Sequence, residues 1–252
     1  MLSVIIITKN EAHNMRNCLE SIAWADEIIV LDSGSTDETT NIAREYTQHV
    51  YTSSDWQGFG IQKNRALGYT SKDWVLSLDA DERVTPALRL ELESAMKNSH
   101  NNVAFNIPRS SNYCGRFMKH SGWFPDYVIR LFRRGFGSFS NNIVHENLII
   151  NGNIGKLKQP LIHFAFTNLE EVLNKINHYS SAGALQNLNR GKKSSLGIAI
   201  RHALWAFIRT YFFQAGFLDG REGFMLSVSN AEGVYYRYVK LMYLHENNQT
   251  KN

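Results

Sequence analysis

The sequence predicts an α/β fold, in which a mostly parallel sheet is flanked by helices and followed by a helical C-terminal extension. Short apolar stretches typical of buried strands alternate with stretches of helical periodicity in the first part of the chain. This alternation implies a parallel sheet with right-handed crossovers. Acidic residues follow three of the apolar stretches, at the strand ends where α/β sheets bind ligands.

The first strand is expected at Ser3–Thr8, because an unbroken apolar stretch is typical of a strand that is buried on both faces. A helix follows at once, since apolar residues recur at helical spacing from Ala12 to Ile22. The second strand is expected at Glu27–Leu31. We interpret Ser35 and Glu38 as a capping box that opens the next helix.

The next helix and strand are expected between residues 58 and 78. Gly58–Tyr69 has the composition of a helix that carries Lys63, and Trp74–Leu78 is typical of a buried strand. Thr85-Pro86 combines an N-cap residue with a proline at the first helical position, so a further helix begins there.

The second half of the chain mixes strands with long helices. The strands are expected at Val103–Ile107, Tyr127–Arg133, Leu148–Leu157 and Leu161–Ala165. Asn151-Gly152 indicates a tight hairpin within the third of these. Thr167 and Glu170 predict another capping box that opens a helix, and beyond Gly191-Lys-Lys-Ser the chain is expected to be helical to about Leu244 with a break near residues 216–223. We therefore expect one domain at residues 1–166 and a helical extension at residues 167–252.

Acidic side chains are expected to meet at one edge of the sheet, because parallel strands end together. They are Glu11, Asp32, Asp37, Asp79 and Asp81. Asp79 and Asp81 are two residues apart, so an extended backbone points both to the same side. Two hard carboxylates so close suit Mg²⁺ or Mn²⁺. The alternative is that each acidic cluster caps the helix that follows it.

The composition and the motifs exclude several classes of protein. With 43% hydrophobic and 20% charged residues, the chain is typical of a folded globular protein. No Gly-x-Gly-x-x-Gly follows the first strand and no Walker-type motif occurs. A net charge of +4 and a pI near 9.0 suit an anionic partner, without indicating nucleic acid. The two cysteines lack metal spacing, which favours a reducing cytoplasm, and no signal peptide or transmembrane run is expected.

Three ordered motifs resemble the signatures of family 2 glycosyltransferases of GT-A (Rossmann-like) fold. They are Ser3-Val-Ile-Ile-Ile-Thr-Lys-Asn-Glu11, Val-Leu-Asp32-Ser-Gly-Ser-Thr-Asp37 and Leu-Asp79-Ala-Asp81-Glu82. Later motifs resemble the subgroup that adds β-glucose to a heptose of the lipopolysaccharide inner core. These are Gly122-Trp-Phe-Pro-Asp126, Arg130-Leu-Phe-Arg-Arg134, Val144-His145-Glu146 and Gly216-Phe-Leu-Asp219-Gly220.

The resemblance implies a pocket for a UDP-sugar donor and a divalent metal. Asp32 would accept a hydrogen bond from the uracil ring, and Lys63 would face the diphosphate. Asp79 would contact the ribose or the metal, while Asp81 would hold the metal that neutralises the leaving UDP. The implied nucleotide-sugar residues are Thr8, Asn10, Glu11, Asp32, Asp37, Lys63, Asp79 and Asp81.

An inverting transfer also needs a base that takes the proton of the acceptor hydroxyl. Many relatives use an Asp in a Glu-Asp pair upstream of Gln-x-x-Arg-Trp, and neither pattern occurs here. We expect Glu146 to be the base, with Asp126 as its rival. Trp123 and Arg130 are the candidates for binding the acceptor, because an aromatic face suits a sugar and a guanidinium suits phosphate. His145 and His163 are weaker candidates for metal ligands, since a lone histidine is more often structural.

The helical C-terminal part interleaves aromatic and basic residues. Leu196–Leu218 and Val234–Leu244 both show this pattern, which favours a helix lying at the surface of an anionic membrane. The alternative is a helical pair that packs on the catalytic domain or in a dimer. We expect a cytoplasmic enzyme, peripheral at the cytoplasmic face of the bacterial inner membrane.

The expected reaction is therefore the inverting transfer of a hexose, glucose from UDP-glucose, to a heptose of the lipopolysaccharide core. A family 2 transferase acting on a different cell-surface glycan is the first alternative. A haloacid-dehalogenase-type phosphohydrolase also carries Asp-x-Asp, but after its first strand and usually with Thr or Val where Arg83 stands here. A non-catalytic membrane-surface module is the third, and the intact acidic motifs argue against it.

Overall fold

The computed structural model describes residues 1–140 and 147–249, and the chain divides into two compact units. The first unit comprises Met1–Arg109 and Asp126–His163, and the second comprises Ser110–Pro125 and Phe164–Asn252. Residues 110–125, which the sequence prediction placed with the first domain, thus cluster with the C-terminal helices.

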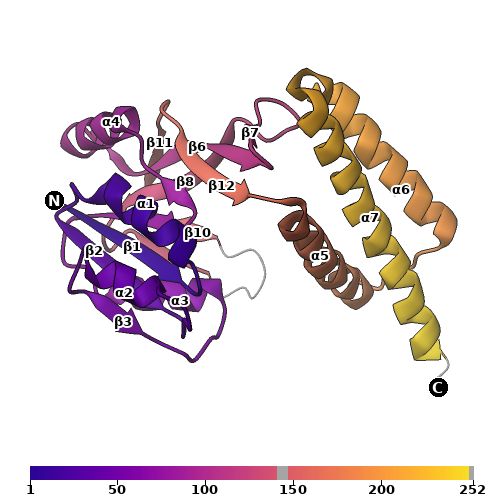
Figure 1. Cartoon of the computed structure of the whole chain (residues 1–252), viewed down its shortest axis with the longest axis horizontal. Coiled ribbons are helices and arrows are strands. Elements are labelled where there is room, and N and C mark those ends of the chain that lie inside the picture. The colour runs from indigo at the N-terminus through magenta and orange to yellow at the C-terminus, as the bar shows by residue number, and fades with distance from the viewer. Residues whose placement is uncertain (141–146, 250–252) are drawn as a thin grey trace. The chain divides into compact units, whose positions relative to one another are not determined.

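The first unit is built on a mixed sheet in the order β3-β2-β1-β4-β8-β6-β12-β5 (Figure 1). Its parallel strands are β1 (Leu2–Thr8), β2 (Glu27–Asp32), β3 (Val50–Thr52) and β4 (Trp74–Asp79). Strand β8 (Asp126–Arg133) runs antiparallel to β4 and to β6 (Asn102–Tyr113). Strands β12 (Leu161–Phe166) and β5 (Glu82–Arg83) pair antiparallel, and β11 (Asn153–Lys156) pairs parallel with β6. The predicted α/β fold with a mostly parallel sheet is confirmed.

Helices cover both faces of this sheet because its strands are apolar on both sides. Val4 and Ile6 belong to a core shared with α1 (Ala12–Ile22), α2 (Thr39–Arg44) and α4 (Pro86–Lys97). Ile5 belongs to the opposite core with Ala66 of α3 (Phe59–Gly68). The small sheet of β9 (Gly137–Phe139) and β10 (Leu148–Ile150) contributes to that second core. The expected cap of α4 is also present, since Thr85 Oγ1 accepts from the Leu88 N–H.

Two local predictions in this unit were wrong. Helix α2 begins at Thr39 without a side-chain cap, because the Ser35 hydroxyl donates to Asp32 within its own turn instead. The hairpin expected at Asn151-Gly152 does not form. Strand β10 pairs with β9 whereas β11 pairs with β6, so these residues join strands of two different sheets. The local turn signal predicted that β10 and β11 pair with each other, but each of them pairs with a different strand instead.

The second unit is mainly helical. It contains β7 (Arg116–Phe117), α5 (Leu169–Asn189), α6 (Leu196–Ile208), the π-helical η1 (Arg209–Phe213), the 3-10 helix η2 (Gly216–Asp219) and α7 (Gly220–Gln249). Helix α7 packs against both α5 and α6, and a small core forms around Tyr113, Val172 and Leu226. None of the helices in the described part of the chain is both long and apolar enough to cross a membrane.

The capping box of α5 lies one residue later than predicted. The N-cap is Asn168, whose Oδ1 accepts from the Glu171 N–H at 2.9 Å, and the Glu171 carboxylate accepts from the Thr167 N–H at 2.7 Å. Thr167 and Glu170 had been expected to exchange these bonds. The extended backbone of Asn168 (φ −149°) places the side chain of this residue, rather than that of Thr167, over the first turn.

Candidate functional site

The turns that follow β1 and β2 are joined by side-chain hydrogen bonds. The N–H of Asn10 donates to Ser35 Oγ at 2.8 Å, and Asn10 Oδ1 accepts from the Thr36 N–H at 2.8 Å. The N–H of Glu11 donates to Thr39 Oγ1 at 2.8 Å. Asn10 occupies the left-handed region with φ 55°, a conformation that asparagine tolerates better than most residues. The two turns therefore form one surface beside the strand ends.

Asp37 completes this junction. Its Oδ2 accepts from the Ala12 N–H at 3.2 Å, and its Oδ1 accepts from the Thr39 N–H at 3.0 Å. Hydrogen bonds, led by the one from the Thr39 hydroxyl, lower the pKa of Asp37. The structure thus brings Asp37 next to Glu11, as the order of the motifs predicted.

Asp32 and Thr8 lie side by side at the ends of β2 and β1, where they are register partners. Asp32 is 2% exposed, and its Oδ2 accepts from the N–H groups of Gly34 and Ser35 at 3.0 and 2.9 Å. Thr8 Oγ1 is buried and has no hydrogen-bond partner among the described residues. Because a buried hydroxyl is costly to leave unpaired, Thr8 offers a hydrogen bond to a ligand at this edge.

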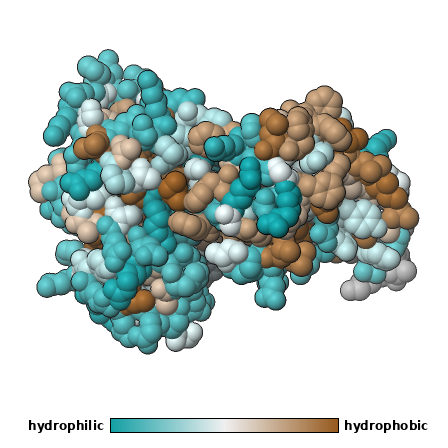
Figure 2. All heavy atoms as spheres, turned by 45° about the horizontal axis from the view of Figure 1, so that its top comes forward, coloured by the Kyte–Doolittle hydropathy of each residue, from teal (hydrophilic) through white to brown (hydrophobic). Residues whose placement is uncertain are grey.

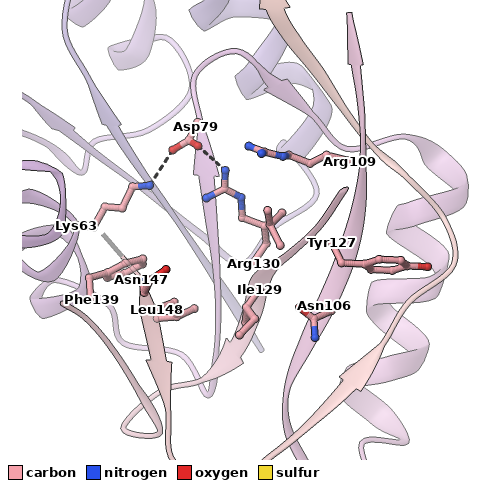
Figure 3. A pocket seen from close by; sticks show the side chains of 11 residues that line it. Lys63, Asp79, Asn106, Arg109, Tyr127, Ile129, Arg130, Phe139, Asn147 and Leu148 are labelled. Carbon is pink, nitrogen blue, oxygen red and sulfur yellow. Dashed lines mark hydrogen bonds and ion pairs between the residues drawn. The ribbon is translucent and has the colours of Figure 1, made fainter. Parts of the chain in front are cut away.

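Asp79 lies between two cations at the end of β4 (Figure 3). Its Oδ1 is 3.1 Å from Lys63 Nζ, and its Oδ2 accepts from Arg130 Nη2. Arg130 Nη2 also donates to Glu82 Oε1 at 2.6 Å, while Glu82 Oε2 accepts from the Asp79 N–H at 3.0 Å. The Lys63 and Arg130 side chains are 6% and 9% exposed, so this is a largely buried ion-pair network.

The network separates the pKa values of its two carboxyl groups. Burial raises the pKa of Asp79, but Arg130 and Lys63 outweigh it and hold that pKa far below its ordinary value. Burial raises the pKa of Glu82, which is 0% exposed, and the attraction of Arg130 compensates only in part. The negative charge of the pair therefore resides mainly on Asp79.

Asp81 differs from Asp79 in having an unsatisfied oxygen. Asp81 Oδ1 is buried without a hydrogen-bond partner in the described residues, and Asp81 Oδ2 is 3.3 Å from His163 Nε2. Burial raises the pKa of Glu11, and the charges of Asp81 and Asp37 raise it further. Because β1 pairs in parallel with β2 and β4, the acidic clusters that follow these strands lie at one edge of the sheet, as predicted.

A cavity of about 420 Å³ opens beside this network. Lys63, Asp79 and Arg130 line it together with Arg109 of β6 and Tyr127 of β8 (Figure 3). Three cationic side chains thus face one cavity, and each of them is paired with a carboxylate.

Sequence reasoning missed Arg109 and assigned no role to Glu82. Arg109 Nε and Nη2 donate to Asp126 Oδ2 at 3.0 and 2.5 Å, and Arg109 Nη1 is 3.6 Å from Glu82 Oε1. Arg109 is 17 positions from its partner Asp126, and no local pattern signals such a pair. Glu82 could have been found, since it completes the motif of Asp79 and Asp81.

The remaining predicted residues are divided between the second unit and the part of the chain that is not described. Glu146 and His145 lie outside the described residues. Trp123 belongs to the second unit, where its ring lies 5.7 Å from Tyr113 and 6.1 Å from Phe166. Its aromatic face is therefore partly used in packing.

The loop that carries Trp123 is held by a buried carboxylate. Asp219, which is 0% exposed, accepts from the N–H groups of Lys119 and His120 at 3.1 and 2.8 Å. The N–H of Ser121 donates to the carbonyl of Gln214 at 2.8 Å. A Cβ atom at Gly216 would lie 2.8 Å from the carbonyl oxygen of Thr210. These contacts explain why glycine and aspartate occur together in the motif of residues 216–220.

Comparison with known proteins shows the family of the chain. The family model described as "Glycosyl transferase family 2" matches residues 3–155, which include every strand-end motif described above. The chain belongs to glycosyl transferase family 2. This membership accounts for the acidic edge of the sheet and contradicts the phosphohydrolase hypothesis.

Relatives of this family 2 glycosyltransferase match most of its length. The lipopolysaccharide core biosynthesis glycosyltransferase LpsC of Rhizobium meliloti is 31% identical over 97% of this chain and 93% of its own length. An uncharacterized glycosyltransferase of Rickettsia typhi is 33% identical over 95% of this chain and 86% of its own length. These matches extend through the helical second unit.

Solved structures agree on the fold. The structure of S. aureus TarS 1-349 in complex with UDP-GlcNAc covers 97% of this chain and 92% of its own, with a TM-score of 0.51 and 16% sequence identity. At this identity the likeness concerns the fold alone. It supports the GT-A architecture that the motifs implied.

Proposed function

We propose that this glycosyltransferase moves a hexose, glucose from UDP-glucose, to a heptose of the lipopolysaccharide inner core, with inversion at the anomeric carbon. The observation that carries the proposal is the likeness to LpsC, a lipopolysaccharide core glycosyltransferase, over 97% of this chain. The likeness includes the second unit, which a shared nucleotide-sugar fold would not require. We retain residues 1–166 as the catalytic domain and residues 167–252 as its helical extension.

A divalent cation, Mg²⁺ or Mn²⁺, fits the residues at the end of β4. Among the described residues, no group of three or more His, Cys, Asp or Glu side chains is arranged to hold a metal by itself. Asp81 nevertheless offers a buried, unpartnered carboxylate oxygen, and Asp79 lies beside it in the same motif. Magnesium commonly takes one or two carboxylates and completes its ligands with substrate phosphates. When bound, the cation would neutralise charge on the departing UDP.

The residues around the acidic edge would hold the donor. Asp32 and Thr8 would bind the uridine, and Thr8 would do so by a hydrogen bond from its unpaired hydroxyl. Asn10, Glu11 and Asp37 would line the same pocket. Lys63, whose Nζ lies 3.1 Å from Asp79, would face the diphosphate from the cavity wall.

The acceptor hydroxyl must lose its proton as it attacks the anomeric carbon. We propose that the Glu146 carboxylate takes this proton, and Asp126 is the alternative base. Asp126 Oδ2 already accepts two hydrogen bonds from Arg109, so this oxygen is engaged and less available to an acceptor hydroxyl. Trp123 would stack on the acceptor sugar. Arg130 would act on acceptor phosphate through the charge it contributes to the cavity, since its guanidinium is bound to Asp79 and Glu82.

A donor screen with purified enzyme and a heptose-terminated core acceptor tests this function. We expect product with UDP-glucose in the presence of Mn²⁺, and β-configured glucose on heptose by NMR. Product with a different UDP-sugar, or with a different glycan acceptor, would favour another family 2 activity. UDP-glucose turnover with no product on heptose would contradict the proposal.

The acceptor lies in lipopolysaccharide, so we place the enzyme peripherally at the cytoplasmic face of the inner membrane.

A further inference from the structure

Positive charge is concentrated in one segment of the second unit. Residues 172–218 contain six Lys and Arg residues and no Asp or Glu, although the whole chain carries a net charge of only +4. Lys192, Lys193, Arg201 and Arg209 of this segment are exposed. This segment therefore carries exposed cationic side chains and no carboxylate of its own.

Helix α6 carries an exposed apolar stripe. Leu196, Ile200, Leu204 and Ile208 recur at a spacing of four and are 51%, 45%, 60% and 38% exposed. Residues four apart lie on one face of a helix. An apolar stripe on a surface helix normally faces the protein core. Here the stripe faces away from the unit.

The cationic residues of α6 lie directly beside this stripe. Arg201, Trp205 and Arg209 also have a spacing of four, and they follow the apolar residues by one position, which is about 100° around the helix. All three are exposed. Helix α6 therefore exposes an apolar row and, next to it, a row that contains two arginines.

The apolar surface continues past the end of α6. Phe212, Phe213, Phe217 and Leu218 are 57%, 73%, 49% and 55% exposed. Ring contacts join the aromatic residues, with Tyr211 lying 5.1 Å from Phe212 and 6.2 Å from Phe217. Figure 2 shows apolar side chains gathered over the part of the molecule that holds α6 and α7. We call the exposed residues of α6, η1 and η2 the aromatic-basic surface.

We propose that the aromatic-basic surface binds an anionic lipid bilayer, with its aromatic rings at the acyl-chain boundary and Arg201 and Arg209 at the headgroups. The proposal gives a contact surface to the peripheral location suggested above, and it does not depend on which sugar is transferred. Apolar area and attraction to anionic lipid together determine the affinity of an interfacial helix. Aromatic residues prefer the interface between acyl chains and water.

Charge distinguishes the bilayer from a second copy of this chain. A two-fold contact would place the arginines of one copy against those of the other, with no exposed carboxylate in residues 172–218 to neutralise them. An anionic leaflet supplies the opposite charge. With 13 residues, α6 is too short to span a bilayer, which needs about 20, so it would lie in the plane of the surface.

Vesicle flotation of the full chain tests the proposal without any sugar substrate. We expect binding to vesicles of phosphatidylcholine with phosphatidylglycerol, and little binding to phosphatidylcholine alone. The double variant Phe212→Ser, Phe213→Ser should lower the partition coefficient at least about tenfold. The double variant Arg201→Glu, Arg209→Glu should abolish the preference for anionic lipid. Leu90→Ser and the pair Lys97→Glu, Lys158→Glu, which are exposed positions of the first unit, should leave binding unchanged.

Trp205 supplies a direct reporter of insertion. Lipids brominated along their acyl chains should quench its fluorescence on binding, and Trp205→Phe should remove that quenching while the protein still floats. Absence of binding to anionic vesicles would overturn the proposal. A concentration-dependent dimer that disappears in the Phe212→Ser, Phe213→Ser variant would also overturn it. Transfer to a short soluble acceptor should persist in these variants, so failure of membrane binding and failure of the proposed function give different results.

Discussion

Arg130 of β8 donates to the carboxylate of Asp79 at the end of β4. The pair connects two residues 51 positions apart and sets the charge of the cavity wall, because Arg130 also binds the fully buried Glu82. Asp79 is therefore part of an ion-pair network as well as of the acidic motif. The stability of the first unit and the shape of the proposed donor site depend on the same contacts.

Arg130→Met should destabilise the protein strongly. The substitution leaves the carboxylates of Asp79 and Glu82 without their shared cation, and breaking a buried pair in this way costs about 3–5 kcal/mol. Chemical denaturation measures the loss in the free energy of unfolding. Arg16→Met removes an exposed pair with Glu45 and serves as the control, with a much smaller expected cost because solvent screens this pair. Equal effects of the two variants would show that the network does not stabilise the fold.

Acid should destabilise the protein partly through Asp79. Its pKa in the folded state lies below the ordinary value of 3.8, so its contribution is complete above that value. This contribution is lost as the pH falls further, because Asp79 then binds a proton in the unfolded chain but not yet in the folded chain. In Asp79→Asn, the free energy of unfolding should fall less steeply below pH 3.8. An unchanged slope would assign the acid sensitivity to other carboxylates.

Glu82 should change the free energy of unfolding with pH in the opposite direction. Its pKa in the folded state is raised above 4.5, so its contribution to stability is complete below that value and is lost as the pH rises through the folded pKa. Glu82→Gln should remove this decline while keeping an acceptor for Arg130. Unfolding curves measured between pH 4 and pH 8 would show it. A decline equal to that of the unmodified chain would argue that Glu82 stays charged.

Asp81→Ala should abolish metal-dependent binding of UDP, because its unpartnered oxygen is the available carboxylate ligand in the motif. Calorimetric titration with UDP, with and without Mn²⁺, separates the metal contribution from nucleotide contacts. Asp73→Ala is a matched control, since that carboxylate is 76% exposed and pairs with the N-terminal ammonium. Retained Mn²⁺-dependent binding in Asp81→Ala would remove Asp81 from the metal site.

Glu146→Gln should preserve donor binding but lower the rate of transfer by about 10²–10⁴-fold, the usual contribution of a general base. Asp126→Asn is the comparison that decides between the two candidates. It should reduce transfer much less, since Asp126 is held by Arg109. Turnover should be measured at saturating acceptor, so that kcat reports the proton transfer. A larger loss in Asp126→Asn would exchange the two assignments.

Asp219→Ala should destabilise the second unit by about 1–3 kcal/mol, because two backbone N–H groups of the loop before Trp123 lose a buried carboxylate acceptor. Asp219→Asn keeps one acceptor oxygen and should recover part of the loss. Thermal unfolding monitored by circular dichroism compares the two variants. Equal stability of Asp219→Ala and the unmodified chain would mean that the loop does not need this anchor.

The sequence predicted the fold where local patterns report burial. Unbroken apolar stretches marked β1, β2 and β4, and the helical spacing from Ala12 to Ile22 matched α1. The acidic residues after these strands had to share an edge once the strands were parallel. Local signals failed at Asn151-Gly152, where the flanking strands found distant partners instead of each other.

The sequence by itself determined the family, the parallel half of the sheet and the edge at which Asp32, Asp79 and Asp81 gather. The tertiary structure alone decided which cations neutralise which carboxylates, and it paired Arg130 with Asp79 and Arg109 with Asp126. The physical reason is that periodicity along a chain reports the face on which a side chain lies. The partner that it meets there depends on the order and register of strands that are distant in the sequence.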